Sequence, residues 1–260
     1  MSTPRNAIVT GSTSGIGLGI AHALAGQGYN ILFNGFGDQA EIDALVADTA
    51  KKFNVKTAYS NADMSKADAI ATMIADAEKT FGSVDVLVNN AGIQHTARIE
   101  DFPQEKWEAI LAINLSAAFY AMKAALPGMQ KRNYGRIINI ASAHGLVASP
   151  QKSAYVAAKH GIVGLTKVAA LENATSNITV NAICPGWVHT PLVQKQIEDK
   201  AKQKGCSVEQ AQDDLLSEKE PSKRFTTAEE IGGLVVFLCG DMAGNITGSS
   251  FSNDGGWTAQ

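Results

Sequence analysis

Tyr155 and Lys159 lie four positions apart, and together they have the side chains needed to move a proton. In a helix this spacing places both on one face, so a phenol and an ammonium reach the same bound atom. A free tyrosine, with a pKa of ~10, is a poor base at neutral pH, and a neighbouring cation favours its phenolate. The pair therefore predicts general acid–base chemistry. The alternative is a packed tyrosine beside a solvated lysine, which is favoured only if Ser142 is absent from the site.

Ser142 and Asn114 are polar residues that suit the same chemistry. Ser142 follows the apolar run 136–140, where its hydroxyl would hold a substrate oxygen while Tyr155 takes the proton. Asn114 falls within a segment of helical spacing, where an amide is disfavoured because it competes for backbone hydrogen bonds. We therefore expect Ser142 in one site with Tyr155, and we regard Asn114 as a candidate member of it.

A glycine-rich turn near the start of the chain predicts a dinucleotide site. The apolar run 7–9 leads through Thr10-Gly11-Ser12-Thr13-Ser14-Gly15-Ile16-Gly17 into a helical pattern. Glycines allow a tight turn and a close approach to a pyrophosphate, whose charge is held by the N–H groups and dipole of the helix start. The spacing is G-x-x-x-G-x-G rather than G-x-G-x-x-G, so the turn needs support from other motifs.

Short apolar runs alternate with longer segments of helical spacing along the chain. The apolar runs are 7–9, 31–33, 55–59, 84–88, 136–140, 178–183 and a last one around Ser250; the helical segments are 15–27, 38–53, 65–81, 104–131, 151–175 and 227–240. This alternation predicts an α/β fold, a doubly wound (Rossmann-type) sheet of seven parallel strands with helices on both faces. Because no linker divides the chain, we expect one domain over residues 1–260 rather than two smaller ones.

Residues 190–224 interrupt the alternation after the sixth strand. This stretch is polar and charged, with helical propensity and little apolar content. Ligands of such folds bind outside the carboxyl ends of the strands, where this insertion emerges. We expect a helical substrate lid, and a surface elaboration is the alternative.

Composition excludes several classes of protein. The 22 Lys and Arg against 25 Asp and Glu give a net charge of −3, without the basic runs typical of proteins that bind nucleic acid or membranes. No run reaches the ~18 apolar residues of a membrane span, and no leader segment is evident. The three cysteines form no pattern typical of disulfides or metal ligands, so we expect a cytoplasmic protein without a catalytic metal.

The glycine turn, Asn89-Asn90-Ala91-Gly92, Asn114, Ser142 and Tyr155 with Lys159 together resemble the short-chain dehydrogenase/reductase family over essentially the whole chain. The resemblance implies hydride transfer between a nicotinamide C4 and a carbinol carbon, with Tyr155 as base in oxidation and acid in reduction. We expect the Lys159 ammonium and the positive nicotinamide ring of the oxidised cofactor together to favour the Tyr155 phenolate. It also implies that Asn114 helps to anchor a water chain to Lys159. The resemblance assigns to the cofactor Gly11, Thr13, Ser14, Gly15, Ile16, Gly17, Phe36, Asp63, Met64, Asn90, Ala91, Gly92, Tyr155, Lys159, Pro185, Gly186, Trp187, Val188 and Thr190.

The choice between NAD and NADP depends on the end of the second strand. A NAD site places an acid there for the ribose 2′-hydroxyl, and an NADP site places an arginine. This chain has Phe33-Asn34-Gly35-Phe36-Gly37, which is neither. Since a 2′-phosphate finds no cation here and Phe36 can pack against the adenosine, we expect NAD, with NADP as the alternative.

Polar residues that hydride chemistry does not require surround the catalytic set. They are Gln94, His144, Lys152 and Gln196, and each alone is compatible with a solvated loop. Together they predict a clamp for a small carboxylate substrate, because an unpaired buried carboxylate is costly. Trp187 and Trp257 would wall off the apolar part of that substrate, although packing explains either equally well.

The segments around these residues are similar to the D-3-hydroxybutyrate dehydrogenase group of the family. That resemblance implies NAD-dependent interconversion of (R)-3-hydroxybutyrate and acetoacetate. One alternative is an NADPH-dependent reductase of 3-oxoacyl thioesters or other carbonyls, and another is a cofactor-sensing regulator without turnover. The family is usually tetrameric, which implies a homotetramer formed through residues 104–131, 151–175 and the C-terminal strand.

Overall fold

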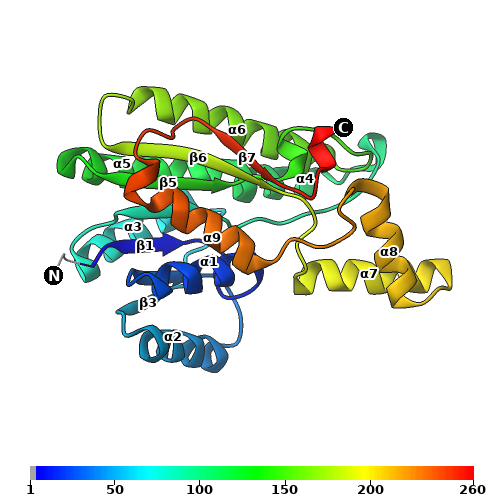
Figure 1. Ribbon diagram of the computed structural model, residues 1–260, viewed down its shortest axis with the longest axis horizontal. Helices are drawn as coiled ribbons and strands as arrows, with labels where there is room; N and C mark the ends of the chain where they lie inside the picture. The colour runs from blue at the N-terminus through cyan, green and yellow to red at the C-terminus, as the bar shows by residue number, and fades with distance from the viewer. Residues whose placement is uncertain (1–3) are drawn as a thin grey trace.

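The sheet expected from the apolar runs is present in the computed structural model, which describes residues 4–260. Residues 1–3 of the expected domain lie outside the described residues. Seven parallel strands pair in the order β3-β2-β1-β4-β5-β6-β7. Figure 1 shows the sheet with β7 toward the top and β3 toward the bottom. The strands are β1 (Asn6–Val9), β2 (Asn30–Asn34), β3 (Thr57–Ser60), β4 (Val86–Asn89), β5 (Gly135–Ile140), β6 (Ile178–Pro185) and β7 (Ser250–Asn253). The order reverses between β1 and β4, so a ligand-binding crevice is expected at their carboxyl ends.

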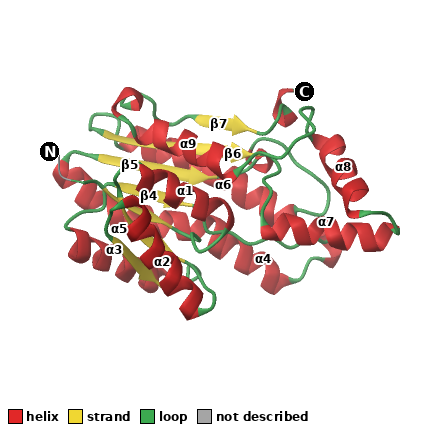
Figure 2. Cartoon of the chain, turned by 60° about the horizontal axis from the view of Figure 1, so that its bottom comes forward, coloured by secondary structure: helices red, strands yellow, loops and turns green. Residues whose placement is uncertain are grey.

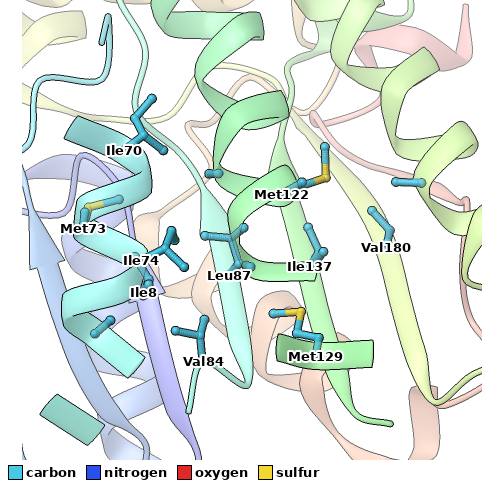
Figure 3. Close-up of a cluster of buried hydrophobic side chains, with 14 of the residues drawn as sticks. Ile8, Ile70, Met73, Ile74, Val84, Leu87, Met122, Met129, Ile137 and Val180 are labelled. Atoms are coloured by element: carbon cyan, nitrogen blue, oxygen red, sulfur yellow. The ribbon is translucent and has the colours of Figure 1, made fainter. Parts of the chain in front are cut away.

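Helices cover both faces of this sheet. They are α1 (Gly15–Gly26), α2 (Gln39–Phe53), α3 (Ala67–Phe81), α4 (Gln104–Leu111), α5 (Ala117–Arg132), α6 (Ser153–Glu172) and α9 (Ala228–Cys239). One buried layer joins the sheet to α3 and α5 (Figure 3), where Leu87 and Ile137 of the strands meet Ile74 and Met122 of the helices. A second layer lies beneath α1 and α9 on the other face. The fold prediction is therefore confirmed.

The helix expected over 104–131 is present but is not α-helical throughout. It contains a π-helical segment, Ala112–Ser116, between α4 and α5. By length and composition, Gln104–Arg132 is the one helix among residues 4–260 that would suffice to cross a membrane. Its residues Ala121 and Met122 instead pack against the sheet, as residues of core helices do.

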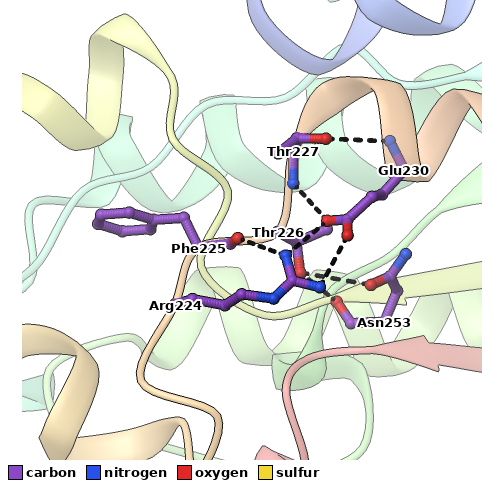
Figure 4. Close-up of polar contacts among 6 residues, drawn as sticks. All are labelled: Arg224, Phe225, Thr226, Thr227, Glu230 and Asn253. Carbon is purple, nitrogen blue, oxygen red and sulfur yellow. Dashed lines mark hydrogen bonds and ion pairs between the residues drawn. The ribbon is translucent and has the colours of Figure 1, made fainter.

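The polar stretch 190–224 forms two helices, α7 (Pro191–Lys204) and α8 (Val208–Lys219). They pack on each other through a small apolar cluster of their own, made by Val193, Ile197, Ala201 and Ala211. Figure 2 shows the pair beyond one end of the strands. The chain then returns to the sheet through Arg224 and Thr226, which bind Glu230 of α9 and Asn253 of β7 (Figure 4).

Candidate active site

The glycine turn between β1 and α1 has the geometry that a pyrophosphate requires. Gly11 and Gly15 have φ angles of +62° and +56°, which side chains rarely adopt, and a Cβ added at Gly17 would lie 2.3 Å from the carbonyl oxygen of Gly11. Ser14 precedes α1 and makes no side-chain cap, and the first turn of the helix has no acidic residue. The positive end of α1 therefore faces the site without a competing anion.

Asn34 connects this turn to the neighbouring strands, a role that its position in the sequence does not reveal. Its buried Oδ1 accepts a hydrogen bond from the backbone N–H of Gly11 (3.2 Å), while its Nδ2 donates to the carbonyl oxygens of Ser60 (3.1 Å) and Ala62 (3.0 Å). Sequence reasoning considered this position only as one lacking an acid or a base. The amide fixes the turn between β2 and the end of β3.

Thr10 and Asn90 connect the turn to the end of β4. The Thr10 hydroxyl accepts hydrogen bonds from the backbone N–H groups of Asn90 (2.9 Å) and Ala91 (3.0 Å). The Asn90 side chain donates in return to the carbonyl oxygens of Thr10 (2.9 Å) and Gly11 (3.0 Å). The two motifs at β1 and β4 therefore form one rigid unit. Thr10 is a further contributor that the sequence analysis missed.

A cleft of about 420 Å³ opens at this switch point. It brings together the residues expected around the cofactor except for two: it is lined by Gly11, Thr13, Ser14, Gly15, Ile16, Gly17, Phe36, Asp63, Met64, Asn90, Ala91, Gly92, Tyr155, Lys159, Pro185, Gly186 and Thr190. The exceptions are Trp187 and Val188, which line a neighbouring cavity. Ile93 and Pro191 line the cleft without having been predicted.

Tyr155 and Lys159 lie on α6 at the floor of the cleft, near Ser142. The Lys159 Nζ lies 5.5 Å from the centre of the Tyr155 ring and donates to the carbonyl oxygen of Ile140 at 2.7 Å. Burial lowers the pKa of Lys159 to about 8. Burial raises the pKa of Tyr155, and the Ser142 side chain opposes that rise.

In the chain by itself, the loss of hydration on burial is therefore the larger effect on Tyr155. The expected lowering of this pKa, which requires the Lys159 ammonium together with the positive nicotinamide ring of an oxidised cofactor, stays a prediction. A further positive charge is needed to bring the tyrosine into the working range.

Asn114 lies in the π-helical segment and is almost fully buried. Its amide is bound on both sides to the backbone of Ile93, donating to the carbonyl oxygen and accepting from the N–H, both at 2.9 Å. Asn114 and Lys159 share the wall of a cavity of about 10 Å³. That volume is close to the minimum that holds one water molecule. The arrangement suits a water that links the two residues.

A second cavity of about 140 Å³ adjoins the cleft beneath α7. All six residues expected to bind substrate line it, namely Gln94, His144, Lys152, Trp187, Gln196 and Trp257. Ser142 and Tyr155 line it as well, so the proton-transfer groups face both cavities. The structure therefore brings the carboxylate clamp and the catalytic set together.

Lys152 is the charged group of this second cavity. It is the one cation among the described residues of the lining, and its Nζ lies 5.0 Å from the centre of the Trp187 ring. Burial lowers the pKa of Lys152 to about 8 and that of His144 to about 3. His144 is therefore neutral at pH 7, with its Nε2 3.0 Å from the hydroxyl of Ser149, a partner that the sequence analysis missed.

Two tryptophans form an aromatic wall on this cavity. The rings of Trp187 and Trp257 stack with centroids 6.2 Å apart, and the His144 ring meets Trp257 edge-on at 5.0 Å. Both Trp187 and Trp257 therefore line the cavity and also pack against each other. Both also line an adjoining cavity of about 570 Å³. Their contact with a substrate stays a prediction.

Comparisons with known proteins agree with this geometry. Residues 11–258 match the family model described as enoyl-(acyl carrier protein) reductase. The chain is 58% identical to D-beta-hydroxybutyrate dehydrogenase of Cupriavidus necator over 100% of both chains, and 53% identical to that of Rhizobium meliloti over 98% of this chain and 99% of the relative. A crystal structure of actinorhodin polyketide ketoreductase with NADPH superposes with a TM-score of 0.93 at 33% identity, covering 100% of both chains. The chain belongs to the short-chain dehydrogenase/reductase family of nucleotide-dependent oxidoreductases.

Proposed function

We propose that this enzyme oxidises (R)-3-hydroxybutyrate to acetoacetate with NAD, and catalyses the reverse reaction. The observation that carries the proposal is the cavity of about 140 Å³ in which Lys152 alone is charged, next to Ser142 and Tyr155. Two relatives more than half identical to this chain bear the name D-beta-hydroxybutyrate dehydrogenase, which supports the same substrate.

Lys152 would pair with the substrate carboxylate. A buried carboxylate needs a cation or strong hydrogen-bond donors, and the amides of Gln94 and Gln196 line the same cavity. The rings of Trp187 and Trp257 would then contact the apolar end of a four-carbon acid. The ammonium and the two amides near Tyr155 suit a carboxylate, which disfavours the alternative reductase of 3-oxoacyl thioesters.

Ser142 and Tyr155 would handle the substrate hydroxyl. Ser142 holds the oxygen, and the Tyr155 Oη accepts the hydroxyl proton in oxidation and returns it in reduction. The cofactor, when bound, supplies the nicotinamide C4 that accepts the hydride. Lys159 keeps positive charge beneath the tyrosine, and Asn114 holds the water next to Lys159. Because burial raises the pKa of Tyr155, proton removal depends on the positive charge of the oxidised cofactor nearby.

Several features near the adenosine end favour NAD over NADP. Asn34, Gly35 and Phe36 line this end of the cleft, and none of them is charged. Phe36 is 68% exposed and offers a flat apolar surface to an adenosine. Among residues 34–38 no side chain is cationic. A 2′-phosphate would therefore find no cationic partner in this stretch.

We further propose one domain with α7 and α8 as a substrate lid over 190–224, assembled as a cytoplasmic homotetramer. The lid proposal follows from Gln196 of α7, which lines the substrate cavity. Phe119 of α5 and Val168 and Leu171 of α6 are exposed large apolar residues on the helices expected at subunit contacts. Sedimentation analysis of the purified protein tests the assembly, and a monomer at micromolar concentration would contradict it.

Initial rates with (R)- and (S)-3-hydroxybutyrate, each with NAD and with NADP, test the proposed reaction. We expect turnover of the (R) isomer but not of the (S) isomer, and with NAD but not with NADP. Turnover of a 3-oxoacyl thioester with NADPH, without turnover of either hydroxybutyrate, would favour the alternative reductase. Cofactor binding with no turnover of any of these substrates would favour the regulator.

A further inference from the structure

Glu220 is a buried acid at the end of the lid that the proposed mechanism does not use. It follows α8 directly and is 1% exposed, although a lone buried carboxylate is costly. Two charged groups on the surrounding elements act on the pKa of Glu220. They are Asp254, which follows β7, and Arg224, which lies between α8 and α9. Asp254 is engaged by Gly256 and Thr258. Arg224 is paired with Glu230 of α9.

One carboxylate oxygen of Glu220 holds the backbone of the substrate cavity. Its Oε1 accepts a hydrogen bond from the N–H of Trp187, and a Cβ added at Gly186 would lie 2.2 Å from the same oxygen. The absence of a side chain at Gly186 therefore leaves the space that the carboxylate fills. The other oxygen, Oε2, is buried and has no hydrogen-bond partner among the described residues.

The segment that leaves the lid holds Trp187 at both of its backbone polar groups. The Glu220 carboxylate accepts a hydrogen bond from the N–H of Trp187. The N–H of Thr226 donates to the carbonyl oxygen of Trp187 at 2.9 Å. The Trp187 ring stacks on Trp257 and lies below the Lys152 ammonium. A shift of the Trp187 backbone would therefore move its ring relative to both Trp257 and the Lys152 ammonium.

We infer that Glu220 is a positioning residue for the substrate: its carboxylate sets the place of Trp187, and through it the aromatic wall beside Lys152. This inference rests on the proposed function of that cavity. Burial and the negative charge of Asp254 raise the pKa of Glu220 to about 7, with the Trp187 N–H opposing the rise. Below that pH the carboxyl is protonated and accepts the Trp187 N–H less strongly. The hold on Trp187 is thus strongest above pH 7 and weakens as the pH falls.

Glu220→Ala and Glu220→Gln separate positioning from general stability. Removing the acceptor leaves the buried Trp187 N–H unpaired, so at pH 8 Glu220→Ala should raise the KM for the hydroxy acid about tenfold. The KM for NAD and kcat should stay within about twofold of wild type. Glu220→Gln keeps an acceptor oxygen but not the charge, so its KM at pH 8 should lie between those of the wild type and Glu220→Ala. Asp213→Asn, an exposed change on the same helix, is the matched control and should behave as wild type.

The pH profile supplies the second test. Because Lys152 titrates in both proteins, the test is the ratio of the wild-type KM for the hydroxy acid to that of Glu220→Gln. This ratio should rise toward one as the pH falls from 8 to 6. Tryptophan emission of the unliganded protein should show a transition near pH 7 that Glu220→Gln removes, and this measurement needs no substrate. If the wild type fails to oxidise the proposed substrate, the proposed function fails while the emission test of Glu220 remains decisive.

Three results would overturn the inference. They are an unchanged KM in Glu220→Ala, an emission transition that persists in Glu220→Gln, and a parallel loss of kcat, NAD affinity and thermal stability in both variants. The last would assign Glu220 a general structural role.

Discussion

Lys152 allows a quantitative test of the substrate site. The partly buried ammonium is the one charge on the described lining of the cavity, and a hydrogen bond to a charged group contributes about 1.5–3 kcal/mol. Since 1.4 kcal/mol corresponds to a factor of ten, Lys152→Ala should raise the KM for 3-hydroxybutyrate by roughly 10- to 150-fold. The effect on the KM for NAD should be small because Lys152 does not line the cofactor cleft.

The pH dependence of the same constant follows from the pKa of Lys152, which burial lowers to about 8. The cation that binds the carboxylate is present below this pKa and is lost as the pH rises through it. The protonated fraction falls from about nine-tenths at pH 7 to about one-tenth at pH 9, so the KM should rise about tenfold over that interval. Lys152→Arg keeps its charge throughout, so its KM should not rise over that interval.

Steady-state kinetics at a series of pH values measures both effects. Lys159 also has its pKa lowered to about 8, but it lies beneath Tyr155 and should influence kcat rather than the KM of the hydroxy acid. Lys167→Ala, an exposed change on α6, is a suitable control. An equal rise of KM with pH in wild type and Lys152→Arg would refute the assignment, as would an unchanged KM in Lys152→Ala.

Three further substitutions test other parts of the structure. Tyr155→Phe removes the proton acceptor and should lower kcat by about 10²–10⁴-fold, while NADH binding, followed by fluorescence titration, stays unchanged; substantial turnover would rule out the proposed proton transfer. Phe36→Arg adds a cation at the adenosine end and should raise kcat/KM with NADP by at least about tenfold, and no gain would place the 2′ position elsewhere. Thr227→Ala breaks the capping box of α9, in which the side chains of Thr227 and Glu230 each accept a hydrogen bond from the other's backbone N–H (3.1 and 2.9 Å). The free energy of unfolding measured in urea should fall by about 1 kcal/mol. An unchanged free energy of unfolding would argue against a stabilising role for this cap.

The parts of the fold predicted from sequence are those where one periodicity dominates. Buried parallel strands such as β5 and β6 are continuous apolar runs, and α6 joins them with a helical pattern. The π-helical segment at 112–116 was missed because its composition does not differ from that of an ordinary helix. The position of Asn114 was nevertheless noticed, because an amide in a helix interior is unusual.

The site was predicted where motifs carry it and missed where tertiary contacts create it. Gln94, Lys152 and Gln196 come from distant segments, yet their predicted grouping in one cavity agrees with the structure. Asn34 and Glu220 were not recognised because their roles depend on burial and on partners far along the chain. A polar residue that binds backbone groups across strands looks, in sequence, like any other polar residue.

The order in which the chain is synthesised has a consequence for this architecture. Trp257, which completes the aromatic wall, follows β7, and α9 packs along α1 so closely that Gly19 leaves no room for a Cβ beside Ala228. Helix α1, which follows the glycine turn, is thus covered by α9, which is synthesised late. We expect that a nascent chain stalled before residue 228 completes neither half of the site. Translation that stops early would then yield no partial enzyme that sequesters cofactor without turning over substrate.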